Sequence, residues 1–221
     1  PMYWGCNSYV DAEIGRVVEA AARYGPENTY VIYTSDHGEM MGSHGLGGKC
    51  GGMYEETTHI PLIIRQPNGL GAGTRVSSLA SHIDLLPTML ELAGLEIPPA
   101  LQGESLVPVL ASNANDLERD VLIEYHRNGH YADSWGGFYP IRCVVSGNYK
   151  LSINLLDTDE LYDLEKDPTE VGNLIDNPDY AVIRDQLHDK VLDWMYKNGD
   201  PMRSPAWERR LWRSTRRLSW T

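Results

Sequence analysis

The amino-acid sequence predicts an α/β layered core over residues 1–112, followed by a small α+β subdomain over residues 113–221 with an antiparallel sheet and a packing helix. In the first part, short apolar runs alternate with helical patterns, as in layered α/β proteins. The polar stretch ASNANDLERD then separates the two parts. Three β-rich segments and one long helical pattern follow it, which favours an antiparallel sheet covered by a single helix.

The first part contains a long helix, two short strands and a second helix. Apolar residues recur at helical spacing over residues 9–24, and the stretch GPEN ends that helix. The runs TYVIYTS and IPLIIRQP are typical of short strands that are buried on both faces. In HIDLLPTMLELAG we expect a helix with Asp84 at its N-cap, Pro87 in its first turn and Gly94 at its C-terminal end.

The second part is predicted to hold three β-rich segments and a helix. The segments are VLIEYH, IRCVVSGNYKLSIN and ELYDL, and Gly147 with Asn148 forms a hairpin turn inside the second of them. A long helix is predicted from about Asp179 to Lys197, because its apolar residues recur at helical spacing.

The C-terminal stretch AWERRLWRSTRRLSWT is basic although the chain is acidic. It carries five arginines and three tryptophans. We expect it to dock on the acidic body of the protein, on another subunit or on a membrane surface. A clamp within or between subunits is the favoured interpretation.

Composition and charge exclude several classes of function. Binding to nucleic acid requires a basic face, so the formal charge of −12 argues against that partner. No apolar run approaches the roughly 18 residues of a membrane-spanning helix, so we expect no transmembrane segment. Cys6, Cys50 and Cys143 are odd in number and widely spaced, which indicates neither a disulfide framework nor a zinc site.

An acid, an imidazole and a lysine follow the first predicted strand. In VIYTSDHGEMMGSHGLGGKCGGMYEE, Asp36 and His37 come directly after the apolar run, and Lys49 lies in the glycine-rich stretch beyond them. Ligands bind beyond the carboxyl ends of strands in open α/β sheets. A carboxylate beside an imidazole suits a divalent cation, and a lysine suits a tetrahedral oxyanion. The pattern favours a site for an anionic ester, with an ordinary solvated loop as the alternative.

The stretch SDHGEMMGSHGLGGKCGGMYEETTHIPLII resembles the second metal-site block of the sulfatase family, in the alkaline phosphatase superfamily. The other landmarks of the family occur in order from about residue 8 to residue 197: NSYVDAEIGRVVEA, SHIDLLPTMLELAGLEIP, LQGESLVPVL, IRCVVSGNYKLSI and LYDLEKDPTEVGNL. The resemblance implies the C-terminal portion of an arylsulfatase-like enzyme, with part of an alkaline-phosphatase-like layered core.

The resemblance also assigns expected roles. Asp36 and His37 match two ligands of a divalent cation, usually Ca²⁺ in this family, with Mn²⁺ or Mg²⁺ as alternatives. Lys49 matches the lysine that binds the sulfate group and stabilises charge in the transition state. His44 lies in the matching turn as a candidate for substrate binding, although capping of the loop is favoured for it. Structural roles are expected for five neighbours: Tyr54, Glu55, Glu56, His59 and His82.

Candidates for substrate binding also occur in the second part of the chain. The stretch EYHRNGHYADSWGGFYPIR joins two predicted strands, and in this family the C-terminal subdomain often contributes to the rim of the pocket. His126, His130 and Trp135 are therefore expected to meet a sugar or an aryl group. An ordinary aromatic surface loop is the alternative.

The nucleophile motif of the family is missing from this chain. A sulfatase carries Cys/Ser-x-Pro-x-Arg, whose first residue becomes formylglycine, whereas the three cysteines here are followed by NS, GG and VV. The resemblance therefore implies that the formylglycine and the remaining acidic ligands lie upstream, in a missing N-terminal half of the enzyme. We expect the chain to be the C-terminal fragment of a sulfuric ester hydrolase for a small-molecule or carbohydrate sulfate ester, inactive by itself.

Two other functions are compatible with the same residues. One is a phosphonate or phosphate ester hydrolase of the same superfamily, and the other is a non-catalytic partner module. Without the upstream strands, a sheet edge and an apolar face would be exposed. We therefore expect contacts between chains around that edge, such as a homo-oligomer.

Overall fold

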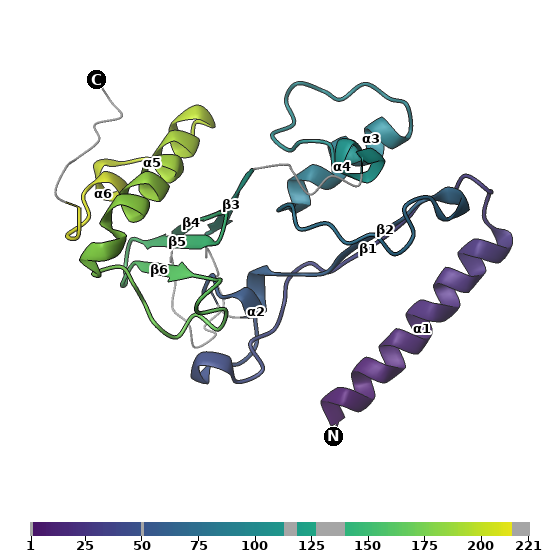
Figure 1. Cartoon of the computed structure of the whole chain (residues 1–221), viewed down its shortest axis with the longest axis horizontal. Helices are drawn as coiled ribbons and strands as arrows, with labels where there is room; N and C mark the ends of the chain where they lie inside the picture. The colour runs from purple at the N-terminus through teal and green to yellow at the C-terminus, as the bar shows by residue number, and fades with distance from the viewer. Residues whose placement is uncertain (1, 50, 113–118, 127–139, 214–221) are drawn as a thin grey trace.

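The computed structural model describes residues 2–49, 51–112, 119–126 and 140–213. Within these ranges the strands form two sheets, a two-stranded sheet of β1 and β2 and a four-stranded sheet in the order β3-β4-β5-β6. The four-stranded sheet, here called the C-terminal sheet, and the helix α5 lie at one end of the molecule, and the helix α1 lies at the other (Figure 1). The mixture of helices and sheets agrees with the predicted α/β class.

The helix α1 (Met2–Tyr24) contains the predicted helix of residues 9–24 and begins seven residues earlier. None of its described residues is buried, and Val10 and Val17 are 52% and 69% exposed. The helix projects away from the remaining elements (Figure 1). Its apolar side chains therefore face solvent in this chain.

The strands β1 (Val31–Thr34) and β2 (Leu62–Arg65) form an antiparallel pair. The expectation that both strands are buried on two faces is wrong for this chain. Tyr33 and Ile63 are cross-strand partners, and they are 40% and 60% exposed. The reason is that, among the described residues, this ribbon has no layer that covers both of its faces.

The helix α3 (Leu85–Leu92) follows a short 3-10 turn, and the helix α4 (Val107–Ser112) packs near it. Asp84 stands at the predicted N-cap, but its buried carboxylate binds other groups than the first turn of α3. Its Oδ2 accepts the Ser81 N–H at 2.7 Å, and its Oδ1 accepts the Arg119 guanidinium at 2.9 Å. Asp84 therefore ties α3 to the segment that leads into the C-terminal sheet.

The C-terminal sheet is antiparallel throughout, and its strands are β3 (Asp120–Tyr125), β4 (Ile141–Ser146), β5 (Tyr149–Asn154) and β6 (Glu160–Asp163). Ser146 pairs with Tyr149, so Gly147 and Asn148 form the two-residue turn that the sequence predicts. Gly147 has a φ of 54°, which glycine adopts without steric cost.

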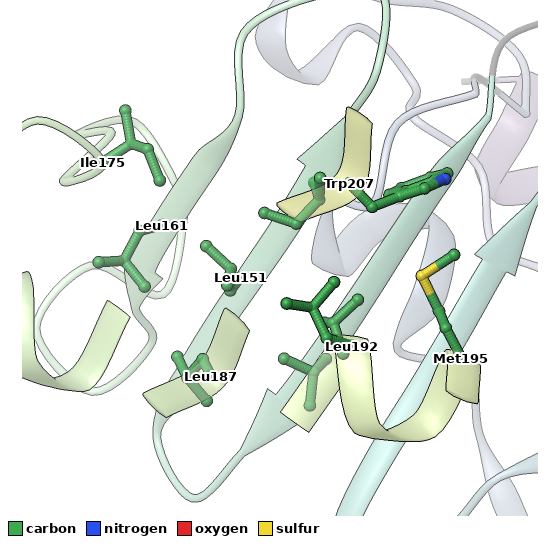
Figure 2. Close-up of a cluster of buried hydrophobic side chains, with 10 residues drawn as sticks. Leu151, Leu161, Ile175, Leu187, Leu192, Met195 and Trp207 are labelled. Carbon is green, nitrogen blue, oxygen red and sulfur yellow. The ribbon is translucent and has the colours of Figure 1, made fainter. Parts of the chain in front are cut away.

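One face of the C-terminal sheet packs against the helix α5 (Ala181–Lys197), which begins close to the predicted start. Leu187, Leu192 and Met195 of α5 meet strand residues such as Leu151, as Figure 2 shows. Trp207 of the short helix α6 (Pro205–Glu208) is 1% exposed and closes this core. The buried aliphatic and aromatic surface on this face is the main hydrophobic core of the described chain.

The other face of the sheet is also covered. Ile141 and Cys143 of β4 pack against Met53, which comes from the segment after the glycine-rich loop. Cys143 is fully buried as a free thiol, and burial raises its pKa to about 11. Because both faces of β4 are covered, this strand is buried along most of its length.

The basic C-terminal stretch docks on the acidic body as far as residue 213. Arg210 binds both carboxylate oxygens of Asp159 at 2.6 and 2.7 Å, and Trp212 donates to the same carboxylate at 2.7 Å. Arg213 pairs with Asp189 of α5 at 2.7 Å. The predicted intramolecular clamp is therefore present in the described residues. No helix among them is long and apolar enough to span a membrane.

Candidate metal and anion site

Asp36 and His37 lie directly after β1, where the chain leaves the strand. The Nδ1 of His37 is 2.8 Å from the Gly38 carbonyl oxygen. Since a carbonyl oxygen only accepts, Nδ1 carries the hydrogen and leaves the Nε2 lone pair available as a ligand. This Nε2 lies 3.4 Å from Oδ2 of Asp36, whose side chain is 81% exposed. A carboxylate and an imidazole therefore converge on one accessible point.

The carboxylate of Asp36 is held in its charged form. The His37 backbone N–H donates to its Oδ1 at 3.0 Å, and this bond is the main reason why the pKa of Asp36 lies below its ordinary value. Desolvation opposes this shift, and the positive charge of Lys49 adds to it. Lys49 lies further along the same glycine-rich loop, and its place beside Asp36 in the site stays a prediction.

Two side chains hold the backbone at the end of β1. His82 Nε2 lies 2.8 Å from the Ser35 carbonyl oxygen, and the Ser35 hydroxyl donates to the His37 carbonyl at 2.8 Å. These contacts are those of a structural histidine, which is what the sequence favours for His82. They fix the direction in which the next two side chains leave the strand.

The loop after His37 is paired with the helix α2 (Glu55–Thr58). The Gly38 N–H donates to the Thr57 carbonyl at 2.9 Å, and the Glu39 N–H donates to the Glu56 carbonyl at 2.9 Å. A Cβ on Gly38 would lie 1.8 Å from the Glu56 carbonyl oxygen, so only glycine fits at this position. The backbone of α2 therefore sets the path of the chain beside the Asp36–His37 pair.

The glycine-rich loop is anchored by a buried methionine. Met40 is fully buried, and its N–H donates to the Gly48 carbonyl at 3.0 Å. The next residue, Lys49, is exposed. The main chain of the loop is thus held one residue before the lysine, whose long side chain stays in solvent.

His44 lies in the turn of this loop with a φ of 54°. Its ring stacks on Tyr54 with 3.8 Å between ring centroids and 12° between planes. Its Nε2 lies 3.9 Å from a carboxylate oxygen of Glu56, and its side chain is only 15% exposed. Both contacts of His44 are therefore with residues at the start of α2 or within it, as expected for a residue that caps the loop.

His126 lies at the end of β3, and His130 and Trp135 lie outside the described residues. The Nδ1 of His126 is 2.9 Å from the Met202 sulfur, and its Nε2 is 3.6 Å from Glu124. Gly51 of the glycine-rich loop lies against the ring of Tyr125, since a Cβ there would be 2.9 Å from that ring. The end of β3 therefore lies beside the loop that carries Lys49.

The Asp36–His37 pair fits one part of a divalent-cation site. Two ligands bound at right angles to one cation at about 2.0–2.6 Å are about 2.8–3.7 Å apart, and the 3.4 Å between Oδ2 and Nε2 lies in that range. In the described ranges, no group of three or more His, Cys, Asp or Glu side chains could hold a metal ion. A metal site built on this pair would therefore require further ligands.

Two residues that the sequence does not single out support α2 from the C-terminal subdomain. Lys150 of β5 and Glu170 contact the N-terminal end of α2, with both side chains 1% exposed. The local pattern gives no such signal, because polar and apolar residues alternate over residues 149–154 and Lys150 has the spacing of a solvent-facing side chain. A buried ammonium at such a position needs acidic partners, and sequence spacing does not say where they come from.

A match to a known protein family shows which family the chain belongs to. The family described as N-sulphoglucosamine sulphohydrolase, C-terminal, matches residues 42–197. The chain belongs to the sulfatase family. The match covers the glycine-rich loop, α2 and the whole C-terminal sheet with α5, and it confirms the resemblance seen in the sequence.

Curated sulfatases and solved structures agree with this assignment. The uncharacterized sulfatase YidJ of Escherichia coli strain K12 is 48% identical over 220 residues, covering 100% of this chain and 43% of that protein. The structure of BT4656 in complex with its substrate D-glucosamine-2-N,6-O-disulfate has 32% identity and a TM-score of 0.76, over 87% of this chain and 39% of that one.

A phosphonate monoester hydrolase of Agrobacterium radiobacter has nearly the same fold. Its identity is 30% and its TM-score 0.75, over 89% of this chain and 41% of that one. This sulfatase-family chain thus spans less than half the length of each of these three relatives. The neighbours confirm the fold class, an alkaline-phosphatase-like α/β arrangement with an antiparallel C-terminal sheet.

Proposed function

We propose that the chain is the C-terminal part of a sulfatase that hydrolyses sulfate esters. The observation that carries the proposal is the Asp36–His37 pair after β1, followed by a glycine-rich loop with an exposed Lys49, in a chain of the sulfatase family. In this proposal, residues 1–112 supply part of the metal and sulfate site. Residues 113–221 form the C-terminal subdomain.

The three side chains have distinct roles in this proposal. Oδ2 of Asp36 and Nε2 of His37 would hold a divalent cation, for which Ca²⁺ is the expected ion, and the bound cation would polarise the sulfate oxygens. The ammonium of Lys49 binds a sulfate oxygen and stabilises the negative charge that develops as the S–O bond breaks. Its exposure in this chain leaves it free to reach an anion that enters from solvent.

The remaining chemistry belongs to the part of the enzyme that precedes these residues. Sulfatases use a formylglycine nucleophile, which we expect upstream together with the other acidic ligands. A sulfated sugar is the proposed substrate class, because BT4656 was solved with D-glucosamine-2-N,6-O-disulfate. His126 is the proposed contact to that substrate from the C-terminal subdomain, since β3 ends beside the glycine-rich loop. His44 is proposed to act on the loop and not on the substrate.

The test uses the full-length protein with 4-nitrophenyl sulfate and D-glucosamine-2-N,6-O-disulfate. Lys49→Met is expected to lower kcat/KM by about 10²–10³-fold, as for the loss of a group that stabilises transition-state charge. Lys197→Met removes an exposed lysine of α5 and is expected to leave kcat/KM unchanged. Equal activity of the two variants would contradict the role of Lys49.

Hydrolysis of phosphonate esters is the second candidate function. The likeness to the phosphonate monoester hydrolase of Agrobacterium radiobacter favours it, because the fold and the ligand types can serve either ester. The same protein assayed with 4-nitrophenyl phenylphosphonate separates the two. A kcat/KM for the phosphonate that exceeds the value for every sulfate ester would overturn the sulfatase proposal.

A further inference from the structure

A buried lysine of the C-terminal sheet lies against the segment that leads into α2. Lys150 of β5 is 1% exposed, and its Nζ donates to the Met53 carbonyl at 2.8 Å and to Glu55 Oε1 at 2.6 Å. It also lies 2.9 Å from Oε1 of Glu170, in an ion pair without a hydrogen bond. A buried ammonium is stable only beside hydrogen-bond acceptors and carboxylates. The position of Lys150 therefore fixes the positions of the Met53 carbonyl and of the two glutamates.

Glu170 holds the same segment through a second contact. Its Oε2 accepts the backbone N–H of Glu55, the first residue of α2, at 2.6 Å. Helix N-termini have N–H groups without partners inside the helix, and a carboxylate there stabilises them. Glu170 has a φ of 52°, which costs a non-glycine residue about 1 kcal/mol or more and is kept only where the surrounding structure imposes it.

The next residues of α2 transmit this constraint to the loop of the candidate site. The carbonyls of Glu56 and Thr57 accept the N–H groups of Glu39 and Gly38. The Thr57 hydroxyl donates to the Met40 sulfur at 3.1 Å, and the Met40 N–H in turn holds the carbonyl that precedes Lys49. Two hydrogen-bonded routes therefore leave α2, one toward the Asp36–His37 pair and one toward the lysine.

We propose that Lys150 and Glu170 are a positioning pair for the candidate site: they fix α2, and the backbone of α2 fixes the loop that carries Asp36, His37 and Lys49. The pair acts through α2 and does not touch the metal or the ester. The identity of the ligand rests on the proposed function, whereas the mechanical coupling between the sheet and the loop does not.

A matched control lies on the other face of the same sheet. Arg142 and Asp200 form an ion pair at 2.7 Å in which both side chains are 1% exposed, the same burial as for Lys150 and Glu170. The guanidinium of Arg142 stacks toward Trp207 in the α5 core, 5.3 Å from the ring centroid. Arg142 also lies 3.2 Å from Glu124 of β3, and neither of these two acidic partners belongs to α2.

The experiment compares Lys150→Met with Arg142→Met in the full-length protein. Hydrogen exchange is followed in peptides covering residues 36–49, and Ca²⁺ and Mn²⁺ are each titrated into the metal-free protein. Lys150→Met is expected to speed exchange in that segment and to weaken metal binding by about 10-fold or more, as with other groups that orient ligands. Arg142→Met is expected to lower thermal stability while leaving both quantities within about twofold of the wild type. Glu170→Gln keeps an acceptor for the Glu55 N–H and is expected to give an intermediate effect.

The result that would overturn the inference is equal behaviour of the two methionine variants, with exchange in residues 36–49 and metal affinity unchanged in both. If Lys150→Met does not fold, Lys150→Arg and Glu170→Gln decide the question by the same two measurements. An altered exchange rate in a protein that hydrolyses no sulfate ester would support the coupling and reject the proposed function. If Lys150→Met leaves hydrogen exchange in residues 36–49 unchanged in a full-length protein that hydrolyses sulfate esters, the proposed function is supported and the coupling is rejected.

Discussion

His188 of α5 is fully buried between the helix and the clamped C-terminal segment. Its Nε2 lies 2.7 Å from the Trp207 carbonyl oxygen, and its Nδ1 lies 2.7 Å from the Arg213 guanidinium. Arginine only donates, so Nδ1 accepts and the ring is neutral. Burial is the main cause that lowers the pKa of His188 to about 4, and Arg213 and Arg210 add to it, against the Trp207 carbonyl and Asp189, which raise it.

This shift predicts a loss of stability in weak acid. The unfolded chain binds a proton near pH 6.5 while the folded chain resists it until about pH 4, so the stabilisation is present above pH 6.5 and is lost as the pH falls toward 4. The contribution of His188 amounts to about 3 kcal/mol at most. His188→Gln is expected to flatten the dependence of Tm on pH between 7 and 4.5, measured by calorimetry on the full-length protein. Parallel curves for variant and wild type would show that the pKa of His188 is not lowered.

At the scale of elements, the pairing of the Asp36–His37 loop with α2 depends on one glycine. Gly38→Ala would place a methyl group against the Glu56 carbonyl, and because that neighbour is backbone the clash cannot be relieved by a rotamer change. We expect a loss of about 1–3 kcal/mol in the free energy of unfolding, together with weaker metal binding. Urea unfolding and Ca²⁺ titration measure the two effects.

Gly47 supplies the control in the same glycine-rich loop. A Cβ there meets nothing within 4 Å, and the residue does not require a positive φ. Gly47→Ala is expected to change the free energy of unfolding by no more than about 0.5 kcal/mol. If both alanine variants behave alike, the close approach of Gly38 to α2 does not exist in solution.

Elements that depend on local sequence could be predicted, and those that depend on distant neighbours could not. The turn at Gly147 and Asn148 and the helix α5 follow from residues within a few positions of each other, and both are present as predicted. The burial of β1 and β2 depends on which layers cover them. Their apolar pattern predicts burial on both faces, but both strands are partly exposed in this chain. In the candidate site, Asp36 and His37 are neighbours in the sequence, so their approach to 3.4 Å follows from one short stretch, whereas the role of Lys49 stays a prediction. The support from Lys150 comes from a residue 95 positions after Glu55, and no pattern of spacing reveals such a partner.

At the scale of the whole molecule, apolar surface is exposed along α1 and the ribbon of β1 and β2. Trp4, Val17 and Ile63 are 74%, 69% and 60% exposed. Large exposed apolar surfaces are rare on soluble monomers and mark interaction sites. We therefore expect this 221-residue chain, prepared alone, to self-associate.

Light scattering after size exclusion tests this expectation at concentrations of about 10–100 μM. The expected mass is larger than the 24.8 kDa of one chain and rises with concentration. A monodisperse monomer with slow amide exchange in β1 and β2 would contradict it. The full-length protein is the control, because residues that cover the ribbon should abolish the concentration dependence.

The hydrogen bond between Glu55 and Glu170 joins residues 115 positions apart. A ribosome adds about 5–20 residues per second, so Glu55 at the start of α2 waits roughly 6–23 s until Glu170 has been synthesised, and the loop of Asp36 and His37, which pairs with α2, waits longer. During that interval the loop is a glycine-rich segment whose backbone groups bind water. With the proposed coupling, a metal ion that arrives during that interval meets Asp36 and His37 before α2 is held in place, and we expect it to bind more weakly than it does after the C-terminal sheet has folded.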